Sequence, residues 1–134
     1  MQGAGVGGTI VPMSLDVTTE ARDGITLVVL SGELDIYTVS TFRTDLETVD
    51  PAASSLVLDL SDVTLLDSSG LGALVSLLNR ARAGDGQLGL ICPQRRIRRV
   101  FEITGLRKAF VFGDDLDSVV AGLAKGPETG AQTA

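Results

Sequence analysis

The segment TLLDSSGLG, residues 64–72, places two hydroxyl side chains after a carboxylate and before two glycines. It stands between a run that predicts a buried strand and a run that predicts an amphipathic helix. Asp67, Ser68 and Ser69 are all residue types that cap helices, because their oxygens accept hydrogen bonds from the free N–H groups of a first turn. A serine at this point is also well placed to carry a phosphate, since helix N-termini favour anions.

On local grounds a helix cap is the simpler interpretation, because serine and aspartate are good N-cap residues, but one capping residue suffices. Three such residues in a row, followed by glycines at 70 and 72, indicate something more. Each glycine in the first turns costs about 1 kcal/mol relative to alanine, which suggests that another group approaches closely. A phosphate here would change the surface charge by about −1.5 to −2 and block whatever docks on it. The segment therefore predicts a cap, a phosphorylation switch, or both.

Enzymatic chemistry is poorly supported by this composition. The chain has no histidine, which excludes a Ser-His-Asp triad, a histidine base and most zinc sites. The two serines do not lie in a G-x-S-x-G motif, and there is no phosphate-binding G-x-x-x-x-G-K sequence. We therefore expect a protein that is not an enzyme and that uses no metal or cofactor.

Length and charge bound the class of protein further. A chain of 134 residues with 44% hydrophobic residues is one globular domain. The net charge of −6 argues against a nucleic-acid partner, and no apolar run reaches the roughly 18 residues of a membrane span. The start lacks a secretory signal, and the single Cys92 suits a reducing compartment. We expect a cytoplasmic protein without a membrane role.

The hydrophobic pattern alternates between strands and helices. Residues 1–13 and 125–134 predict flexible ends, and 14–124 the folded domain. Strands are predicted at 13–21, 25–32, 55–61, 87–92 and 109–112, the first two joined by an Asp23-Gly24 turn. Helices are predicted from Val39 to a stop at Asp50-Pro51, from Gly70 to Gly84, around Ile97 to a break at Gly105, and after Asp114 and Asp115.

This order, ββαβαβαβα, predicts an α/β domain with a mixed, mostly parallel sheet of about five strands and about four helices. The antiparallel strand should lie at one edge. Right-handed crossovers place the loops after the second and third strands at the same edge of the sheet. We therefore expect Glu33 and Asp35 of the first loop to form an acidic surface with Asp67 of the second.

The motifs GELD, DLSDVTLLDSSGLG and ITGL occur here in one order over residues 14–123. Together they make the chain resemble the STAS-domain family of bacterial anti-sigma factor antagonists. The resemblance implies a small α/β protein that binds an anti-sigma factor, itself a serine kinase, so that a sigma factor is released. It also implies that the kinase phosphorylates the antagonist, which then dissociates, and that a serine/threonine phosphatase reverses the modification.

Carried onto this chain, the resemblance implies phosphorylation of Ser68. Partner-binding residues would be Glu33, Asp35, Asp67, Ser69, Gly70 and Arg107. Ser69 and Gly70 would shape the loop, and Arg107 belongs to the stretch ITGLRKAF, which lies near the partner surface in the family. We expect a monomer or a weak dimer.

Two other functions fit the same residues. The chain could be a STAS subunit of a larger assembly, such as a transporter or a stress-signalling scaffold, without a phosphate switch. It could also be a sensor that binds a nucleotide or another anion at the predicted helix start. The cluster RRIRR, residues 95–99, predicts a solvated helix face or a contact with an acidic partner. Cys92 is predicted to be a core residue rather than a reactive thiol.

Overall fold

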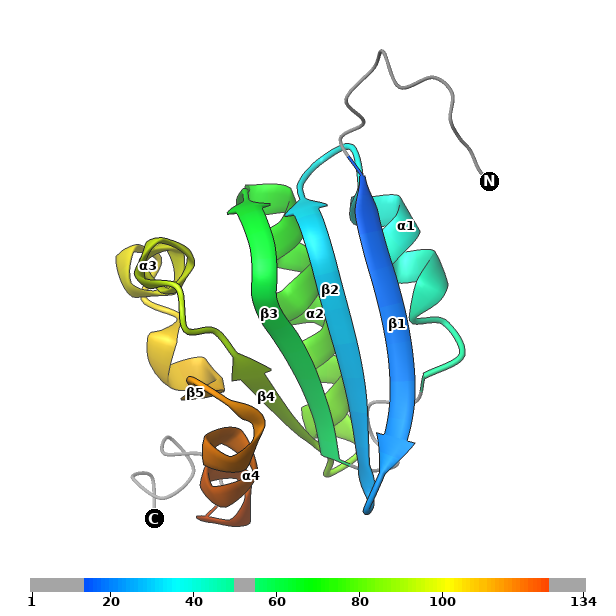
Figure 1. The fold of residues 1–134 in the computed structure, drawn as a ribbon, viewed down its shortest axis with the longest axis vertical. Helices are drawn as coiled ribbons and strands as arrows, with labels where there is room; N and C mark the ends of the chain where they lie inside the picture. The colour runs from blue at the N-terminus through cyan, green and yellow to red at the C-terminus, as the bar shows by residue number, and fades with distance from the viewer. Residues whose placement is uncertain (1–13, 50–54, 126–134) are drawn as a thin grey trace.

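The computed structural model describes residues 14–49 and 55–125. Within these ranges, five strands form one sheet with four α-helices packed on it (Figure 1). The strands are β1 (Leu15–Arg22), β2 (Ile25–Leu34), β3 (Ser55–Leu66), β4 (Gln87–Ile91) and β5 (Val111–Gly113). The helices are α1 (Val39–Asp45), α2 (Ser68–Ala83), α3 (Arg95–Ile103) and α4 (Leu116–Lys125), with a 3-10 helix, η2, at Arg107–Ala109.

The strands lie in the order β1-β2-β3-β4-β5, with β1 antiparallel to β2 and the other pairs parallel. The predicted element order and the antiparallel edge strand are therefore confirmed. Asp23 and Gly24 have positive φ values of 51° and 80°, as a tight hairpin turn between twisted strands requires. The helix predicted to run from Val39 to a stop at Asp50-Pro51 is shorter than predicted, because α1 ends at Asp45 with Leu46 as its C-cap residue. The Asp50-Pro51 pair itself lies outside the described residues, as do the predicted flexible ends apart from Lys125, which belongs to α4.

The helices cover the two faces of the sheet unequally. Alternate residues of a strand point to opposite faces, so Leu56 and Leu58 of β3 join the core beneath α1, α2 and α3, whereas Val57 faces α4. Figure 1 shows α1 and α2 behind the sheet and α4 in front of it, beside β4 and β5. The large core therefore lies on the side from which α2 approaches the ends of β2 and β3.

Other element boundaries also differ from the prediction, most clearly the end of β3 and the start of β5. Strand β3 runs to Leu66 instead of ending near residue 61, because register shifts along β2 allow Asp62 to pair with Ser31 and Leu66 to pair with Leu34. The last strand begins at Val111, later than predicted, since the preceding residues form η2. The first difference matters for function, because it shortens the loop before α2 to Asp67 alone.

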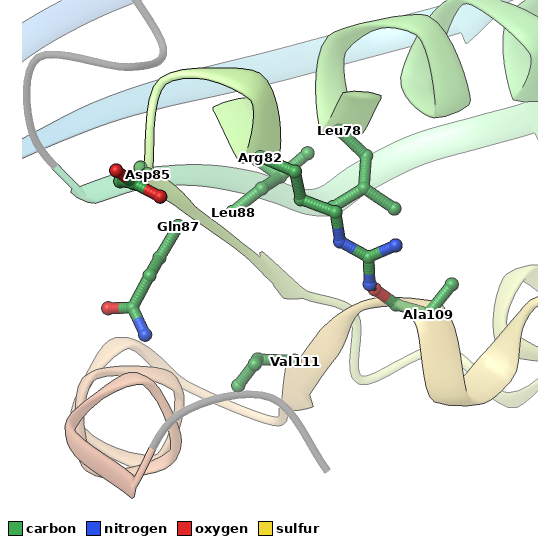
Figure 2. A pocket seen from close by; sticks show the side chains of 8 residues that line it. Leu78, Arg82, Asp85, Gln87, Leu88, Ala109 and Val111 are labelled. Atoms are coloured by element: carbon green, nitrogen blue, oxygen red, sulfur yellow. The ribbon is translucent and has the colours of Figure 1, made fainter. Parts of the chain in front are cut away.

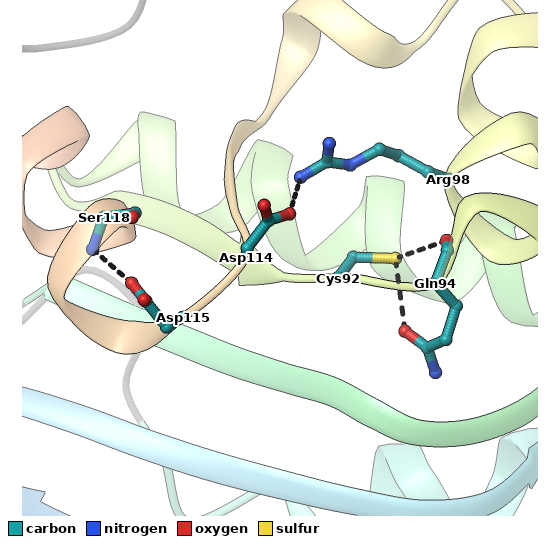
Figure 3. Close-up of polar contacts among 6 residues, drawn as sticks. All are labelled: Cys92, Gln94, Arg98, Asp114, Asp115 and Ser118. Carbon is teal, nitrogen blue, oxygen red and sulfur yellow. Dashed lines mark hydrogen bonds and ion pairs between the residues drawn. The ribbon is translucent and has the colours of Figure 1, made fainter.

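Asp114 and Asp115, after which the last helix was predicted, make different contacts. The side chain of Asp115 accepts a hydrogen bond from the backbone N–H of Ser118 at 2.8 Å (Figure 3). This bond lowers the pKa of the exposed Asp115 carboxyl. The neighbouring Asp114 pairs instead with Arg98 of α3 at 3.1 Å. One acid thus caps α4 and the other ties α3 to the segment before α4.

The packing of α3 provides a matched test of the core. Phe101 is fully buried, and its ring makes edge contacts with Phe110 and Phe112 at centroid distances of 5.5 and 4.9 Å. We expect Phe101→Ala to lower the free energy of unfolding by about 3–5 kcal/mol in urea denaturation. Ile103, on the same helix, is 75% exposed. Ile103→Ala should change the value by less than about 0.5 kcal/mol, and equal losses in the two variants would contradict the assigned packing.

Candidate functional site

The loops that follow β2 and β3 meet at one end of the sheet, as predicted. Figure 1 shows the ends of β2 and β3 together with the first turn of α2. The joining residue is Asp67, whose backbone N–H donates to the carbonyl of Leu34 at 3.3 Å. Its side chain contacts both loops, since Oδ2 accepts from the N–H of Ile36 at 3.1 Å and Oδ1 from the N–H of Gly70 at 3.0 Å. One carboxylate therefore holds the loop after β2 against the start of α2.

Asp67 is the N-cap residue of α2, which leaves Ser68 as the first residue of the helix. Of the three residues that could cap this helix, Asp67 is therefore the cap, because its side chain accepts the hydrogen bond from the N–H of Gly70. Ser68 is exposed, and its hydroxyl makes no hydrogen bond within the described part of the chain. The N–H groups of a first helical turn have no acceptors within the helix. The Ser68 hydroxyl is therefore accessible and lies beside groups that favour an anion.

Ser69 and Gly70 occupy the next two positions of the helix. Ser69 is partly buried and Gly70 is buried. A side chain at position 70 would collide with the backbone and side chain of Leu34 at the end of β2. Gly70 thus permits the close approach of α2 to the sheet, as expected. Gly72 does not, because a side chain there would meet open space.

Asp35 lies at the site but does not form part of an exposed acidic surface. It is only 3% exposed, and its Oδ1 accepts hydrogen bonds from the N–H groups of Tyr37 and Thr38 at 2.9 and 3.1 Å. The Thr38 hydroxyl donates to the carbonyl of Glu33 at 2.6 Å and accepts from the N–H of Asp35 at 3.0 Å. Asp35 therefore fixes the turn between β2 and α1. The expected exposed surface of three carboxylates is corrected accordingly, because a buried carboxylate needs these donors.

Glu33 is the third acidic residue of the expected surface. It is partly buried at the end of β2, where it pairs in register with Leu65 of β3. One carboxylate oxygen, Oε1, is shielded from solvent and has no hydrogen-bond partner among the described residues. With Asp35 buried and both Asp67 oxygens bonded to N–H groups, the site presents less free negative charge than the sequence suggests.

The structure does not bring Arg107 to Ser68. Arg107 belongs to η2, and the last residue of η2, Ala109, accepts a hydrogen bond at its carbonyl from Nη2 of Arg82 at 2.9 Å. Arg82 lies in the last turn of α2, so a rise of about 1.5 Å per residue places it about 20 Å from Ser68 along the helix. A contact of Arg107 with a partner stays a prediction, and it would lie well away from the serine.

Three exposed apolar side chains in the turn after β2 and near the end of β3 were not predicted from the sequence. Ile36 and Tyr37 are 63% and 71% exposed in the turn after β2, and Leu65 is 44% exposed near the end of β3. Ile36 is held beside Asp67 by its backbone hydrogen bond. Two adjoining large apolar residues exposed in one turn, as Ile36 and Tyr37 are, indicate a contact with another molecule. The sequence could have indicated this contact, because the pair Ile36-Tyr37 is unusual in a short polar loop between a strand and a helix.

The end of β3 is supported by two side chains at the start of α3, those of its N-cap residue Gln94 and of Arg96. Strand β4 pairs with β3 only as far as Asp59, so the following carbonyls of β3 lack a neighbouring strand on that side. The side-chain amide of Gln94 donates to the carbonyls of Leu60, Ser61 and Val63 at 2.6–3.0 Å. Nη2 of Arg96 donates to the carbonyl of Thr64 at 2.8 Å. These bonds hold the strand that leads into Asp67.

The arginine cluster at 95–99 therefore divides into two kinds of residue. Arg96 and Arg98 have structural contacts, the second with Asp114 and over the ring of Phe112 at 5.6 Å. Arg95 and Arg99 are exposed and make no ion pair within the described residues. Both predictions for this cluster, a solvated helix face and a contact with an acidic partner, are therefore compatible with Arg95 and Arg99.

Cys92 is a core residue, as predicted. Its side chain is fully buried at the end of β4, with Sγ 3.9 Å from two oxygen atoms of Gln94 (Figure 3). Burial raises the pKa of the Cys92 thiol from 9.0 to about 11, although the guanidinium of Arg98 acts in the opposite direction. The thiol is therefore neutral near pH 7 and unsuited to nucleophilic chemistry.

Metal-binding clusters and helices that could span a membrane are both absent from the described residues. Residues 14–49 and 55–125 contain no group of three or more side chains that could hold a metal ion. None of the helices in these ranges is long and apolar enough to span a membrane.

The chain belongs to the STAS domain family, whose model matches residues 16–119. Relatives include the anti-sigma-B factor antagonists of Staphylococcus aureus strain NCTC 8325 and of Staphylococcus epidermidis. Each is 34% identical over 96 residues, which cover 71% of this chain and 89% of the relative.

Solved structures show the same fold. An anti-sigma factor antagonist from Mycobacterium paratuberculosis has a TM-score of 0.77 at 30% identity, covering 85% of this chain and 97% of its own. The unphosphorylated form of the anti-sigma factor antagonist SpoIIAA has a TM-score of 0.67 at 20% identity, covering 82% and 97%. The phosphorylated form of the Bacillus protein SpoIIAA has a TM-score of 0.61 at 22% identity, covering 81% and 99%. The five-stranded mixed sheet and its helices are thus the STAS fold.

The double role of Asp67 can be tested by stability measurements. Asp67→Ala removes the cap of α2 and the acceptor for the Ile36 N–H. We expect the free energy of unfolding to fall by about 1–2 kcal/mol in urea denaturation. Ser68→Ala, at the next position, should change it by less than about 0.5 kcal/mol, because the Ser68 hydroxyl has no partner to lose. A larger loss for Ser68→Ala than for Asp67→Ala would contradict the capping assignment.

Proposed function

We propose that this protein is an anti-sigma factor antagonist whose activity is switched off by phosphorylation of Ser68. In its unmodified form it would bind an anti-sigma factor that is also a serine kinase, and so release a sigma factor. A serine/threonine phosphatase would restore the binding form. The observation that carries the proposal is the exposed Ser68 hydroxyl at the start of α2, left free because Asp67 caps the helix. The names of the relatives in the STAS family support the same function.

The position of Ser68 suits a reversible modification. A phosphate on this side chain would lie at the positive end of the α2 dipole, near first-turn N–H groups. The helix cap would remain intact, because the hydrogen bonds of Asp67 do not involve the Ser68 side chain. Phosphorylation is therefore expected to change the surface without unfolding the helix.

The apolar surface beside Ser68 explains why the phosphate would prevent binding. Ile36 and Tyr37 are exposed in the turn that Asp67 holds against the start of α2, where a partner that binds at Ser68 could cover them. Covering this surface would also remove a phosphate of charge about −1.5 to −2 from water, which is costly without a matching cation. We infer that the bulk and desolvation of the phosphate, rather than repulsion by an acidic surface, drive release, since Asp35 is buried.

The modified residue can be identified directly. The protein is incubated with an anti-sigma factor kinase and ATP, and the added phosphate is located by intact mass and peptide mapping. We expect one phosphate on wild type and on Ser69→Ala, and none on Ser68→Ala, since Ser68 is exposed and Ser69 is partly buried. Phosphorylation of Ser68→Ala to the wild-type extent would overturn the site. Binding of the kinase without any phosphorylation would instead favour the role of an unphosphorylated subunit in a larger assembly.

The apolar contact is tested by binding measurements with the same partner. Tyr37→Ala should weaken binding to the anti-sigma factor by about tenfold or more in titration calorimetry, because an exposed aromatic side chain at the centre of an interface contributes strongly. The matched control is Ile103→Ala, which removes an equally exposed apolar side chain on α3. Unchanged affinity of Tyr37→Ala, with the wild-type unfolding curve retained, would place the interface elsewhere.

A further inference from the structure

A cavity of about 300 Å³ lies at the end of α2 opposite to Ser68 (Figure 2). It is formed where the last turns of α2, the start of β4 and the segment from η2 to β5 come together. Its apolar lining includes Leu78 and Leu88, whose side chains are otherwise part of the core, and the partly buried Val111. A cavity of this size with an apolar wall has the dimensions of a small-molecule site.

Arg82 supplies a charged group at this cavity. Figure 2 shows its side chain reaching from α2 to Ala109, whose carbonyl accepts from Nη2 at 2.9 Å. This single bond anchors the guanidinium, and the remaining N–H groups have no partner within the described residues. An anchored guanidinium with free donors is a preorganised receptor for a carboxylate, which it can bind through two parallel hydrogen bonds.

The other polar groups at the cavity define which anion fits. Gln87 is already engaged, because its amide donates to the carbonyl of Leu123 in α4. Asp85 lines the cavity without forming an ion pair with Arg82 or any other described residue. Two further cations, Arg107 and Lys108, directly precede Ala109 and are exposed. The surroundings are thus cationic in a chain of net charge −6, while Asp85 opposes a head group with more than one negative charge.

We propose that this cavity is a binding site for a small amphipathic monocarboxylate. The carboxylate would bind the free N–H groups of Arg82, and a short apolar chain would lie against Leu78, Leu88 and Val111. The site is separate from the surface around Ser68, since about 20 Å of α2 lies between Ser68 and Arg82. The inference therefore stands independently of the proposed function.

The probe is hexanoate, added to ¹⁵N-labelled full-length protein and followed by NMR. We expect saturable shifts in residues 78–88 and 109–111, none in 67–70, and a dissociation constant on the order of 1 mM, as suits a ligand of this size. Hexanol and hexylammonium carry the same apolar chain without the negative charge. Each should bind at least about tenfold more weakly than hexanoate, because neither provides a charged acceptor for Arg82.

Arg82→Gln should weaken hexanoate binding about tenfold, whereas Arg80→Gln should leave it unchanged. Arg80 is an exposed arginine in the same turn of α2 as Arg82. Its side chain lines a different groove, which lies between α1 and α2. Thermal unfolding checks that both variants fold. If Arg82→Gln does not fold, the affinities of the three ligands for the wild-type protein test the proposal instead. Absence of saturable shifts at about 10 mM hexanoate, equal binding of hexanol, or unchanged affinity of a folded Arg82→Gln would each overturn the proposal.

Discussion

The carboxylate of Asp67 holds the functional end of the molecule together. Its two oxygens accept backbone N–H groups from two segments that are far apart in sequence, Ile36 after β2 and Gly70 in α2. A hydrogen bond to a charged acceptor is stronger than one between neutral groups, so one side chain can fix both segments. The close approach also needs Gly70, because any side chain there would collide with Leu34. The site exists because this carboxylate and this glycine occur three residues apart.

The same arrangement decides which groups remain available to a partner. Asp35 is buried and fixes its own turn, and Asp67 is occupied by two N–H groups. What remains accessible is the hydroxyl of Ser68 beside the apolar side chains of Ile36 and Tyr37. In the proposed function a partner would bind this surface by apolar contact, and a phosphate on Ser68 would prevent binding, since burying an unpaired charge is costly. The acidic residues Asp35 and Asp67, which the sequence predicts to be a binding surface, therefore fix the backbone of the site. The exposed surface of the site consists of the Ser68 hydroxyl and the apolar side chains of Ile36 and Tyr37.

Much of the fold could be predicted from periodicity and turn residues. The apolar runs at 25–32 and 55–61, the Asp23-Gly24 turn and the helical pattern from Gly70 to Gly84 were sufficient for the element order and the antiparallel edge strand. The end of β3 was not predicted, because residues 62–66 form a strand by pairing with β2 after register shifts. Such pairing depends on a partner strand and on the side chains of Gln94 and Arg96, which are distant in sequence.

The sequence by itself determined the class of protein, the α/β order of its elements and the candidate residues around 67–70. These features follow from local chemistry: hydrophobic spacing, turn propensity, the lack of histidine and a motif shared with a family. Only the tertiary structure decided that Asp67 rather than a serine caps α2, that Asp35 is buried, and that Arg107 lies near the opposite end of the helix. Burial and hydrogen-bond partners depend on which segments meet in space, so no local pattern of residue types can specify them.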